Sequence, residues 1–217
     1  GLVPPPSPND SAAEIQALYQ GDTDLIRLGL LLSMVAGAMT GPFVAAISTQ
    51  LKRIEGQFSP LTYTQLGLGM LGVLLFIIPL FLMSAAAFRP DRDPDLILAL
   101  NDAAWLPFVG AFMTAFFQNI AIGVAVFKDK AERVLPRWLG YFNFWVALLF
   151  VPAGLILFFK TGPFAWNGVF TFWLPLTVFS LWFAVMFVVL RKAVQNQAKE
   201  QQEQPQRTVP EREAVPA

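Results

Sequence analysis

Five long apolar blocks dominate this sequence, each followed by a short stretch rich in charge, proline or glycine. The blocks cover residues 25–49, 61–88, 94–127, 137–159 and 168–190. About 20 helical residues cross the hydrocarbon of a bilayer, since each adds about 1.5 Å. Of all residues 55% are hydrophobic and only 14% are charged, a composition that a soluble chain of this size would have difficulty burying. The pattern predicts an all-α, polytopic transmembrane helical bundle with five spans.

A short amphipathic segment precedes the first block. Ser11 and Glu14 have the Ser-x-x-Glu spacing of a capping box, and Ile15, Leu18 and Tyr19 then fall on one helical face. We expect a short helix that ends near residue 21 and lies on the membrane surface.

The distribution of Lys and Arg predicts how the chain is oriented in the cell membrane. One set of loops holds Lys52, Arg53, Lys128, Lys130, Arg133, Arg137, Arg191, Lys192, Lys199, Arg207 and Arg212, whereas the other holds only Arg27, Arg89, Arg92 and Lys160. Cytoplasmic loops carry the excess of positive charge. We therefore expect residues 1–24 to be extracytoplasmic, residues 25–191 to form the transmembrane domain, and the Gln- and Glu-rich residues 192–217 to form a disordered cytoplasmic tail.

The first residues bear on the number of spans in the parent protein. Gly1-Leu2-Val3 leads directly into three prolines, without an initiator Met. An external N-terminus needs a segment that carries it across the membrane, and a helix entering from the cytoplasm would do so. We expect one N-terminal span to be missing before Gly1, which makes six in all; a cleaved signal segment is the alternative.

Composition excludes several classes of function. The chain has no His and no Cys, so it lacks imidazole bases, thiolate nucleophiles and the usual ligands of zinc, copper and haem. Lys plus Arg equals Asp plus Glu, at 15 each, which gives no basic excess for a nucleic-acid partner. We expect no metal, no cofactor and no enzymatic activity; the expected partners are membrane lipids and another membrane subunit or a second copy.

A ridge of small residues runs along the first block. Its members recur at every fourth position: Gly29, Ser33, Gly37, Gly41 and Ala45. Small residues let helix backbones approach closely, which is how helices associate in lipid. The ridge predicts a helix-packing interface, either within this chain or against a second copy or another subunit.

Prolines and aromatic residues favour a ligand site in the outer half of the bundle. Every block contains a proline, and a proline frees a backbone carbonyl and permits a kink. Gln and Asn inside the blocks line such a site or form hydrogen bonds between helices. The candidate ligand-binding residues are Trp105, Pro107, Gln118, Asn119, Asn143, Pro152, Trp166 and Trp173.

Asp102 is the carboxylate that lies within an apolar block. A proton relay or a membrane enzyme would need such a group. Its place near the outer end of its block favours a simpler role, an interfacial ion pair with Arg27.

Two short stretches carry a resemblance to a family. Leu25-Ile26-Arg27-Leu28-Gly29-Leu30 after the amphipathic segment, and Leu135-Pro136-Arg137-Trp138-Leu139-Gly140 at the start of a block, together with the helix spacing, resemble uncharacterised bacterial six-helix integral membrane proteins. The resemblance implies a first helix before Gly1 and carries no activity with it.

Three hypotheses for function follow. The first is a non-catalytic accessory or assembly component that binds an apolar small molecule, a lipid or another membrane subunit. The second is a small transporter or channel, which needs a continuous polar path. The third is a membrane enzyme that uses Asp102.

Overall fold

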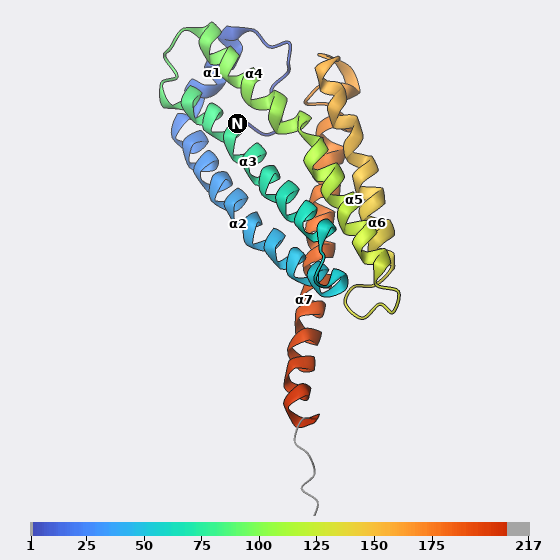
Figure 1. Ribbon diagram of the computed structural model, residues 1–217. Coiled ribbons are helices and arrows are strands. Elements are labelled where there is room, and N and C mark those ends of the chain that lie inside the picture. The colour runs from blue at the N-terminus through green and yellow to red at the C-terminus, as the bar shows by residue number, and fades with distance from the viewer. Residues whose placement is uncertain (1, 208–217) are drawn as a thin grey trace, which may run out of the picture.

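The computed structural model describes residues 2–207, and all regular structure in that part of the chain is helical (Figure 1). Five of its helical segments are long and apolar enough to cross a membrane. They are Thr23–Glu55, Pro60–Phe88, Pro94–Lys128, Trp138–Leu157 and Gly162–Glu203. The prediction of an all-α bundle with five spans is confirmed.

Helix α1 (Ala12–Gly21) precedes the spans and begins with the predicted capping box. The Ser11 amide donates to the Glu14 carboxylate at 2.7 Å, and the Glu14 amide donates back to the Ser11 hydroxyl at 3.4 Å. Ile15 and Tyr19 are fully buried in a cluster with residues of α4. The apolar face of α1 therefore packs on the protein, and its position at the membrane surface stays a prediction.

Helices α2 (Thr23–Glu55) and α3 (Pro60–Phe88) form an antiparallel hairpin. Gly56 ends α2 at φ 77°, a conformation that disfavours residues with a side chain. The Glu55 carboxylate then accepts hydrogen bonds from the amides of Leu61 (3.3 Å) and Thr62 (2.7 Å), so it satisfies the free N–H groups at the start of α3. Its 3.3 Å ion pair with Lys128 fixes the end of α5 to the same turn.

The third span is broken, although the sequence predicts one helix over residues 94–127. Helix α4 (Pro94–Gly110) ends and α5 (Phe112–Lys128) begins at Ala111, which leaves helical geometry at φ −80° and ψ 45°. Pro107 lies one turn before the break. A proline removes one helical hydrogen bond and clashes with the preceding turn, and Gly110 adds backbone freedom. The axes of α4 and α5 therefore diverge (Figure 1).

The fourth and fifth spans contain irregular helical turns. After α6 (Trp138–Phe150) the chain tightens into the 3-10 helix η1 (Val151–Leu157), with Pro152 in its first turn. A short 3-10 turn η2 (Gly162–Phe164) and a π-helical turn η3 (Val169–Trp173) lead into α7 (Leu174–Arg207).

Helix α7 extends well beyond the bundle (Figure 1), although the sequence predicts a disordered tail from residue 192. Contacts with the end of α2 hold this extension: Gln50 donates to Gln197 at 2.9 Å and Arg53 pairs with Glu200 at 2.6 Å. The prediction of a disordered segment is wrong for residues 192–207. The partners that hold this segment lie on α2, far away in the sequence, so the local pattern does not reveal them. The rest of the predicted tail, residues 208–217, lies outside the described residues.

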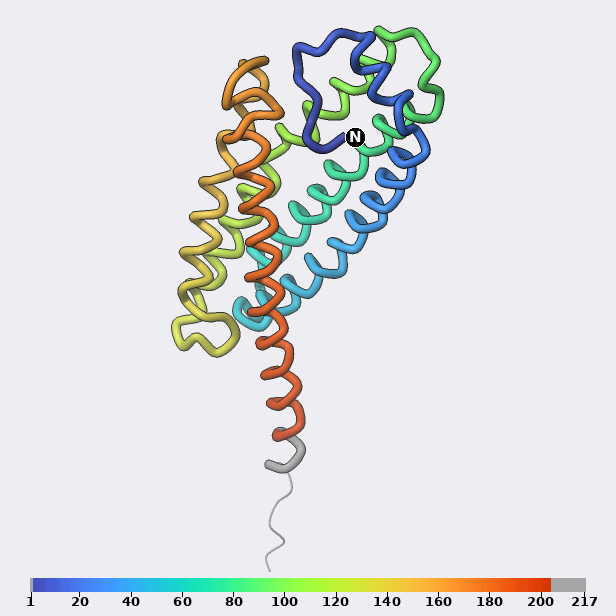
Figure 2. Tube along the Cα trace, turned by 180° about the vertical axis from the view of Figure 1, so that it is seen from behind, coloured from blue at the N-terminus to red at the C-terminus, as the bar shows by residue number. Residues whose placement is uncertain are grey.

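The two ends of the bundle differ in how they are closed. At the end we call the capped end, residues 2–10 form a strap beside α1 (Figure 2). The strap is fastened where Trp166 donates to the Pro6 carbonyl at 2.7 Å and Asn9 donates to the Lys160 carbonyl at 3.1 Å. The opposite end, here the basic end, holds the α2–α3 turn, the α5–α6 loop and the extension of α7.

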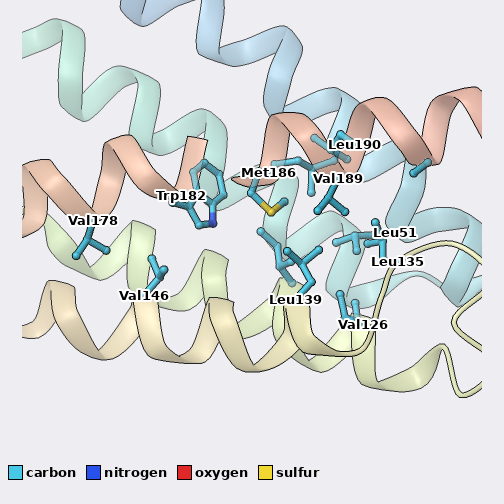
Figure 3. Close-up of a cluster of buried hydrophobic side chains, with 14 of the residues drawn as sticks. Leu51, Val126, Leu135, Leu139, Val146, Val178, Trp182, Met186, Val189 and Leu190 are labelled. Atoms are coloured by element: carbon cyan, nitrogen blue, oxygen red, sulfur yellow. The ribbon is translucent and has the colours of Figure 1, made fainter. Parts of the chain in front are cut away.

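The core consists of two clusters of similar size. Toward the basic end α7 packs against α6, α5 and the end of α2 through a hydrophobic cluster that includes Leu51, Val126, Leu139, Trp182 and Met186 (Figure 3). A second cluster, at the capped end, joins α1, α4, α3 and η3 around Tyr19 and Trp105. Between the two clusters the packing is incomplete.

Candidate membrane cavity

A cavity of about 390 Å³ lies between the two clusters. Residues of α2, α3, the α4–α5 break, η3 and α7 line it. Helices α2 and α7 approach each other near the basic end and diverge toward the capped end (Figure 2), so the side chains between them do not close the space. Ligand pockets in proteins have volumes from about 300 to about 1,000 Å³, and this cavity falls within that range.

The walls of the cavity are apolar and largely aromatic. Eight aromatic side chains line it: Phe76, Phe108, Phe112, Phe150, Phe172, Phe179, Trp182 and Phe183. Among its described lining residues none is charged. Ala36 of α2 and Leu176 and Phe179 of α7 belong to the lining and are also exposed on the bundle surface. The cavity therefore reaches the apolar surface between α2 and α7.

Glycines of α3 determine how deep the cavity is. A Cβ atom at Gly69 would lie only 2.5 Å from Val44 Cγ1 and 2.8 Å from Gln118 Nε2, so here α2, α3 and α5 are in close contact. At Gly72, one turn further on, the nearest atom is Thr114 Oγ1 at 3.8 Å, and a side chain would have room. Gly69 thus marks the floor of the cavity, and Gly72 lies in its open part.

One wall of the cavity is polar. The Nε2 atom of Gln118 has no hydrogen-bond partner among the described residues, although the side chain is 8% exposed. Thr114, one turn earlier on α5, donates only a 3.4 Å bond to the Ala111 carbonyl. On the facing helix Thr40 donates to the Gly37 carbonyl at 2.6 Å. The Nε2 atom of Gln118 is itself buried and lies 2.8 Å from the Cβ position of Gly69, at the floor of the cavity.

Two of the eight predicted ligand-binding residues, Pro107 and Gln118, line the cavity. Trp105 lies one layer behind its wall, with ring centroids 5.6 Å from Phe108 and 6.1 Å from Phe172. Trp105 does not line the cavity directly, because α4 turns this side chain into the capped-end cluster.

The remaining five candidates lie away from the lining as well. Trp166 donates to the strap, Trp173 is exposed, and Pro152 lies in the first turn of η1. Asn143 accepts a 3.0 Å hydrogen bond from Trp182 Nε1 and donates to the Leu139 carbonyl, so it joins α6 to α7. Asn119 donates to the Ala115 carbonyl of its own helix. Asn143 therefore forms the hydrogen bond between helices that was the alternative given above, whereas the bond of Asn119 stays within α5.

The predicted small-residue ridge divides into two parts. Gly37 and Gly41 are buried against α3, where a Cβ at Gly37 would lie 2.6 Å from Phe76. Gly29 and Ala45 are exposed, and Ser33 is half-buried. Positions four apart drift by about 40° around a helix of 3.6 residues per turn, so five of them cannot share one face. The central pair packs within this chain.

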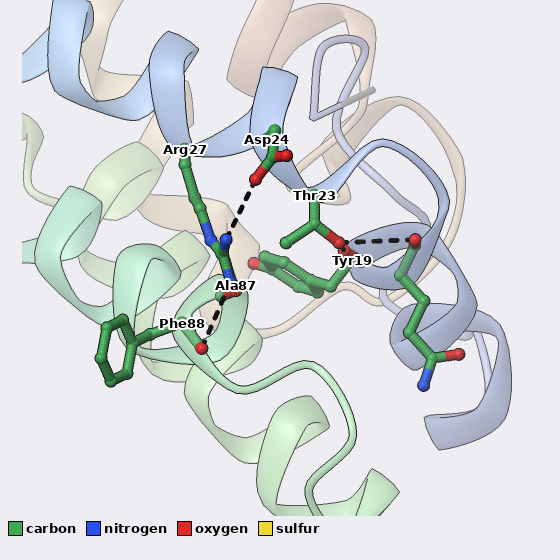
Figure 4. Close-up of polar contacts among 7 residues, drawn as sticks. Tyr19, Thr23, Asp24, Arg27, Ala87 and Phe88 are labelled. Carbon is green, nitrogen blue, oxygen red and sulfur yellow. Dashed lines mark hydrogen bonds and ion pairs between the residues drawn. The ribbon is translucent and has the colours of Figure 1, made fainter.

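Arg27 does not pair with Asp102, as the sequence analysis expected. It lies at the C-terminal end of α3, where it donates to the carbonyls of Ala87 (3.1 and 3.2 Å) and Phe88 (3.3 Å) and pairs with Asp24 at 3.0 Å (Figure 4). The last carbonyls of a helix lack internal partners and favour a cation. Arg27 therefore closes α3, and Asp102 is half-buried on α4 without this partner.

A buried polar pair below the cavity escaped the sequence analysis. Ser48 of α2 donates to Gln65 Oε1 of α3 at 2.5 Å, and both side chains are buried. Gln65 lies one turn before Gly69. A signal was present, because Thr62, Gln65, Gly69 and Gly72 follow each other at intervals of three and four residues and so share one face of α3.

The fold and the cavity together define a class: a multi-pass helical bundle with an apolar cavity among its spans. No family model, no curated protein and no solved structure matches the chain. The resemblance to bacterial six-helix proteins stays a prediction.

Proposed function

We propose that this protein is a non-catalytic component of the cell membrane that binds an apolar molecule of the bilayer in the cavity. The observation that carries the proposal is an uncharged, aromatic-lined space of about 390 Å³ that reaches the bundle surface between two spans. An empty apolar space forfeits the dispersion contacts of its lining, so an apolar occupant is favoured.

The rim supports entry from the lipid. Leu176 and Phe179 are 41% and 39% exposed and line the cavity from α7. A molecule dissolved in the bilayer can pass between α2 and α7 without crossing water. The charge distribution supports an orientation in which the basic end faces the cytoplasm and the capped end faces outward.

A transporter is the second candidate, and one observation favours it. A series of polar groups leads from Gln118 toward the basic end. It includes the Ser48–Gln65 pair and ends where the Thr62 hydroxyl donates to the Glu55 carboxylate at 2.8 Å. These groups extend the polar wall of the cavity toward that end. Each of these donors is already bonded, which favours a structural role over a path for a solute.

The test uses Trp182, the tryptophan that lines the cavity and is only 5% exposed. A brominated long-chain alkane bound in the cavity quenches its fluorescence. We expect saturable quenching in detergent micelles, and we expect Trp182→Phe to abolish the saturable part. Quenching of wild type that never saturates would overturn the proposal.

Gly72→Leu and Gly67→Leu form a matched pair on α3. The leucine side chain introduced at position 72 would extend into the cavity. Gly67 is exposed and has no atom within 4 Å of its Cβ position, so a leucine there would leave the cavity unchanged. We expect the saturable quenching of Trp182 to be lost in Gly72→Leu and kept in Gly67→Leu. Equal behaviour of the two variants would place the bromoalkane elsewhere.

A further inference from the structure

We infer that a groove at the capped end, separate from the cavity, binds the zwitterionic headgroup of a phospholipid: Arg89 and Arg92 bind its phosphate, and Asp91 binds its ammonium. The groove has a volume of about 580 Å³ and lies between the start of α2 and the loop that joins α3 to α4. It shares no lining residue with the cavity, so the inference does not rest on the proposed function.

The cations of the capped end gather in this groove. Arg27, Arg89 and Arg92 line it, and Lys160 is the remaining Lys or Arg at that end of the described chain. The guanidinium of arginine is a planar fork of N–H donors that matches two oxygens of a phosphate. Three such groups around one groove point to a phosphate ligand.

Arg27 prepares the groove for an anion rather than binding one. The carbonyls that end α3 carry the negative end of the helix dipole, which would repel a phosphate. Arg27 donates to the carbonyls of Ala87 and Phe88, and its remaining contact is the 3.0 Å ion pair with Asp24 (Figure 4). These contacts offset the carbonyls and use most of the donors of Arg27.

Arg89 and Arg92 have donors to offer. Among the described residues, neither guanidinium forms a hydrogen bond or an ion pair. Arg92 is half-buried, so its charge is partly withdrawn from water without a partner that compensates for it. Arg89 is exposed and lies over the ring of Phe88, with its Cζ atom 5.9 Å from the ring centroid. A phosphate in the groove would give both guanidinium groups an acceptor.

The loop that carries both arginines is held in place by α1. Gln16 donates to the carbonyls of Pro90 (3.1 Å) and Arg92 (2.6 Å), and Gln20 donates to the Pro90 carbonyl at 3.3 Å. Within the loop, the Arg92 amide donates to the Arg89 carbonyl at 3.3 Å. A backbone fixed in this way lowers the entropy cost of ordering the two side chains around a ligand.

Carboxylates around the groove decide between headgroups. Asp91 lines it, and its Oδ1 atom accepts a 3.2 Å hydrogen bond from Gln20. Asp93 and Asp95 follow at the start of α4. Together they would repel a headgroup with a net negative charge, whereas an ammonium beside the phosphate gives Asp91 a partner. A phosphate ester of ethanolamine in a phospholipid carries both charges and is neutral overall.

Exposed apolar side chains beneath the groove provide a surface for acyl chains. Leu31 lies one turn after Arg27 on α2, and Phe81 lies two turns before Phe88 on α3. They are 55% and 60% exposed, and both lie deeper in the spans than the groove. A phospholipid with its headgroup in the groove can therefore place its chains along α2 and α3, which favours a lipid over a soluble phosphate ester.

The test is native mass spectrometry of the protein released from micelles that contain a lipid at a defined mole fraction. Three lipids with identical acyl chains are compared: phosphatidylethanolamine, phosphatidylglycerol, which has no ammonium, and diacylglycerol, which has no phosphate. A hydrogen bond to a charged group corresponds to about a tenfold difference in Kd. We expect wild-type protein to bind phosphatidylethanolamine about tenfold tighter than diacylglycerol, and phosphatidylglycerol more weakly than phosphatidylethanolamine.

Arg89→Gln combined with Arg92→Gln removes two charges whose side chains make no bond to the protein, so the fold should be kept. We expect this variant to bind phosphatidylethanolamine no more tightly than diacylglycerol. Lys160→Gln is the matched control, because Lys160 is a cation of the capped end that does not line the groove, and it should keep the wild-type order. Asp91→Asn keeps an acceptor for Gln20 and removes the negative charge, so phosphatidylethanolamine and phosphatidylglycerol should then bind about equally.

Four results would contradict the inference. Equal binding of diacylglycerol and phosphatidylethanolamine to the wild type overturns the phosphate site. Binding of phosphatidylglycerol as tight as that of phosphatidylethanolamine overturns the role of Asp91. Displacement of the bound lipid by millimolar O-phosphoethanolamine overturns the assignment to a lipid and makes a soluble phosphate ester the ligand. An equal loss of affinity in Lys160→Gln and in the double variant would trace the effect to the general charge of the capped end.

Discussion

Gly69→Ala tests the close contact of three helices below the cavity. The added Cβ would lie 2.5 and 2.9 Å from the two γ-methyl groups of Val44 and 2.8 Å from Gln118 Nε2. Carbon atoms in contact are normally about 3.5–4.0 Å apart. Rotation of the Val44 side chain gives no relief, because both of its methyl groups face the new atom and a β-branched side chain on a helix is held in one rotamer.

The magnitude follows from a matched substitution on the same helix. Overpacking of a well-packed core costs about 1–3 kcal/mol. Gly67→Ala makes the same change in helix propensity at an exposed site with no atom within 4 Å, so the difference between the two variants isolates the packing cost. We expect Gly69→Ala to be less stable than Gly67→Ala by about 1–3 kcal/mol. Gly72→Ala should resemble Gly67→Ala.

The assay is reversible unfolding in mixed micelles, followed by circular dichroism as the fraction of denaturing detergent rises. The free energy of unfolding is compared among the three alanine variants. A difference between Gly69→Ala and Gly67→Ala within about 0.5 kcal/mol, the usual range for surface substitutions, would refute the close contact of α2, α3 and α5 at this point.

Three further predictions concern the remaining contacts. Asn143→Leu leaves the Trp182 donor buried without an acceptor at a cost of about 1–3 kcal/mol, and adding Trp182→Phe should recover part of it in a double-mutant cycle of unfolding free energies. Trp166→Phe removes the donor to the strap, so limited proteolysis should cleave the strap faster while the unfolding of the spans is unchanged. Hydrogen bonds from Ser11 lower the pKa of Glu14, so they stabilise α1 above the ordinary pKa of glutamate and less as pH falls through the lowered value; the protection of α1 amides relative to their intrinsic exchange rate should fall on acidification, and Glu14→Gln should abolish that dependence.

Features governed by local pattern were predictable from the sequence. Apolar length predicts the five spans, and the spacing of Ser11 and Glu14 predicts the start of α1. The close approach of a helix at Gly37 and Gly41 also followed from residue size. Each of these depends on residues that are neighbours along one helix.

Features that depend on distant partners were not predictable. Arg27 donates to carbonyls of α3 sixty residues away and does not pair with Asp102. Trp182 of α7 donates to the side-chain oxygen of Asn143 on α6. The break at Ala111 lies one turn after Pro107, whereas the prolines in α2 and α3 stay inside continuous helices. A proline permits a break, and the packing around it decides whether the helix continues.

Tyr19 shows how burial alone changes a side chain that the sequence places on a helical face. Burial raises the pKa of its hydroxyl, which donates to Asn101 Oδ1 at 3.3 Å. This contact joins α1 to α4 at the capped end.

The most direct test of the central claim is a structure of the protein in nanodiscs made from its native lipids. We expect elongated density between α2 and α7 that contacts Phe172 and Trp182. A bundle in which α2 and α7 close on each other and side chains fill the cavity would contradict it.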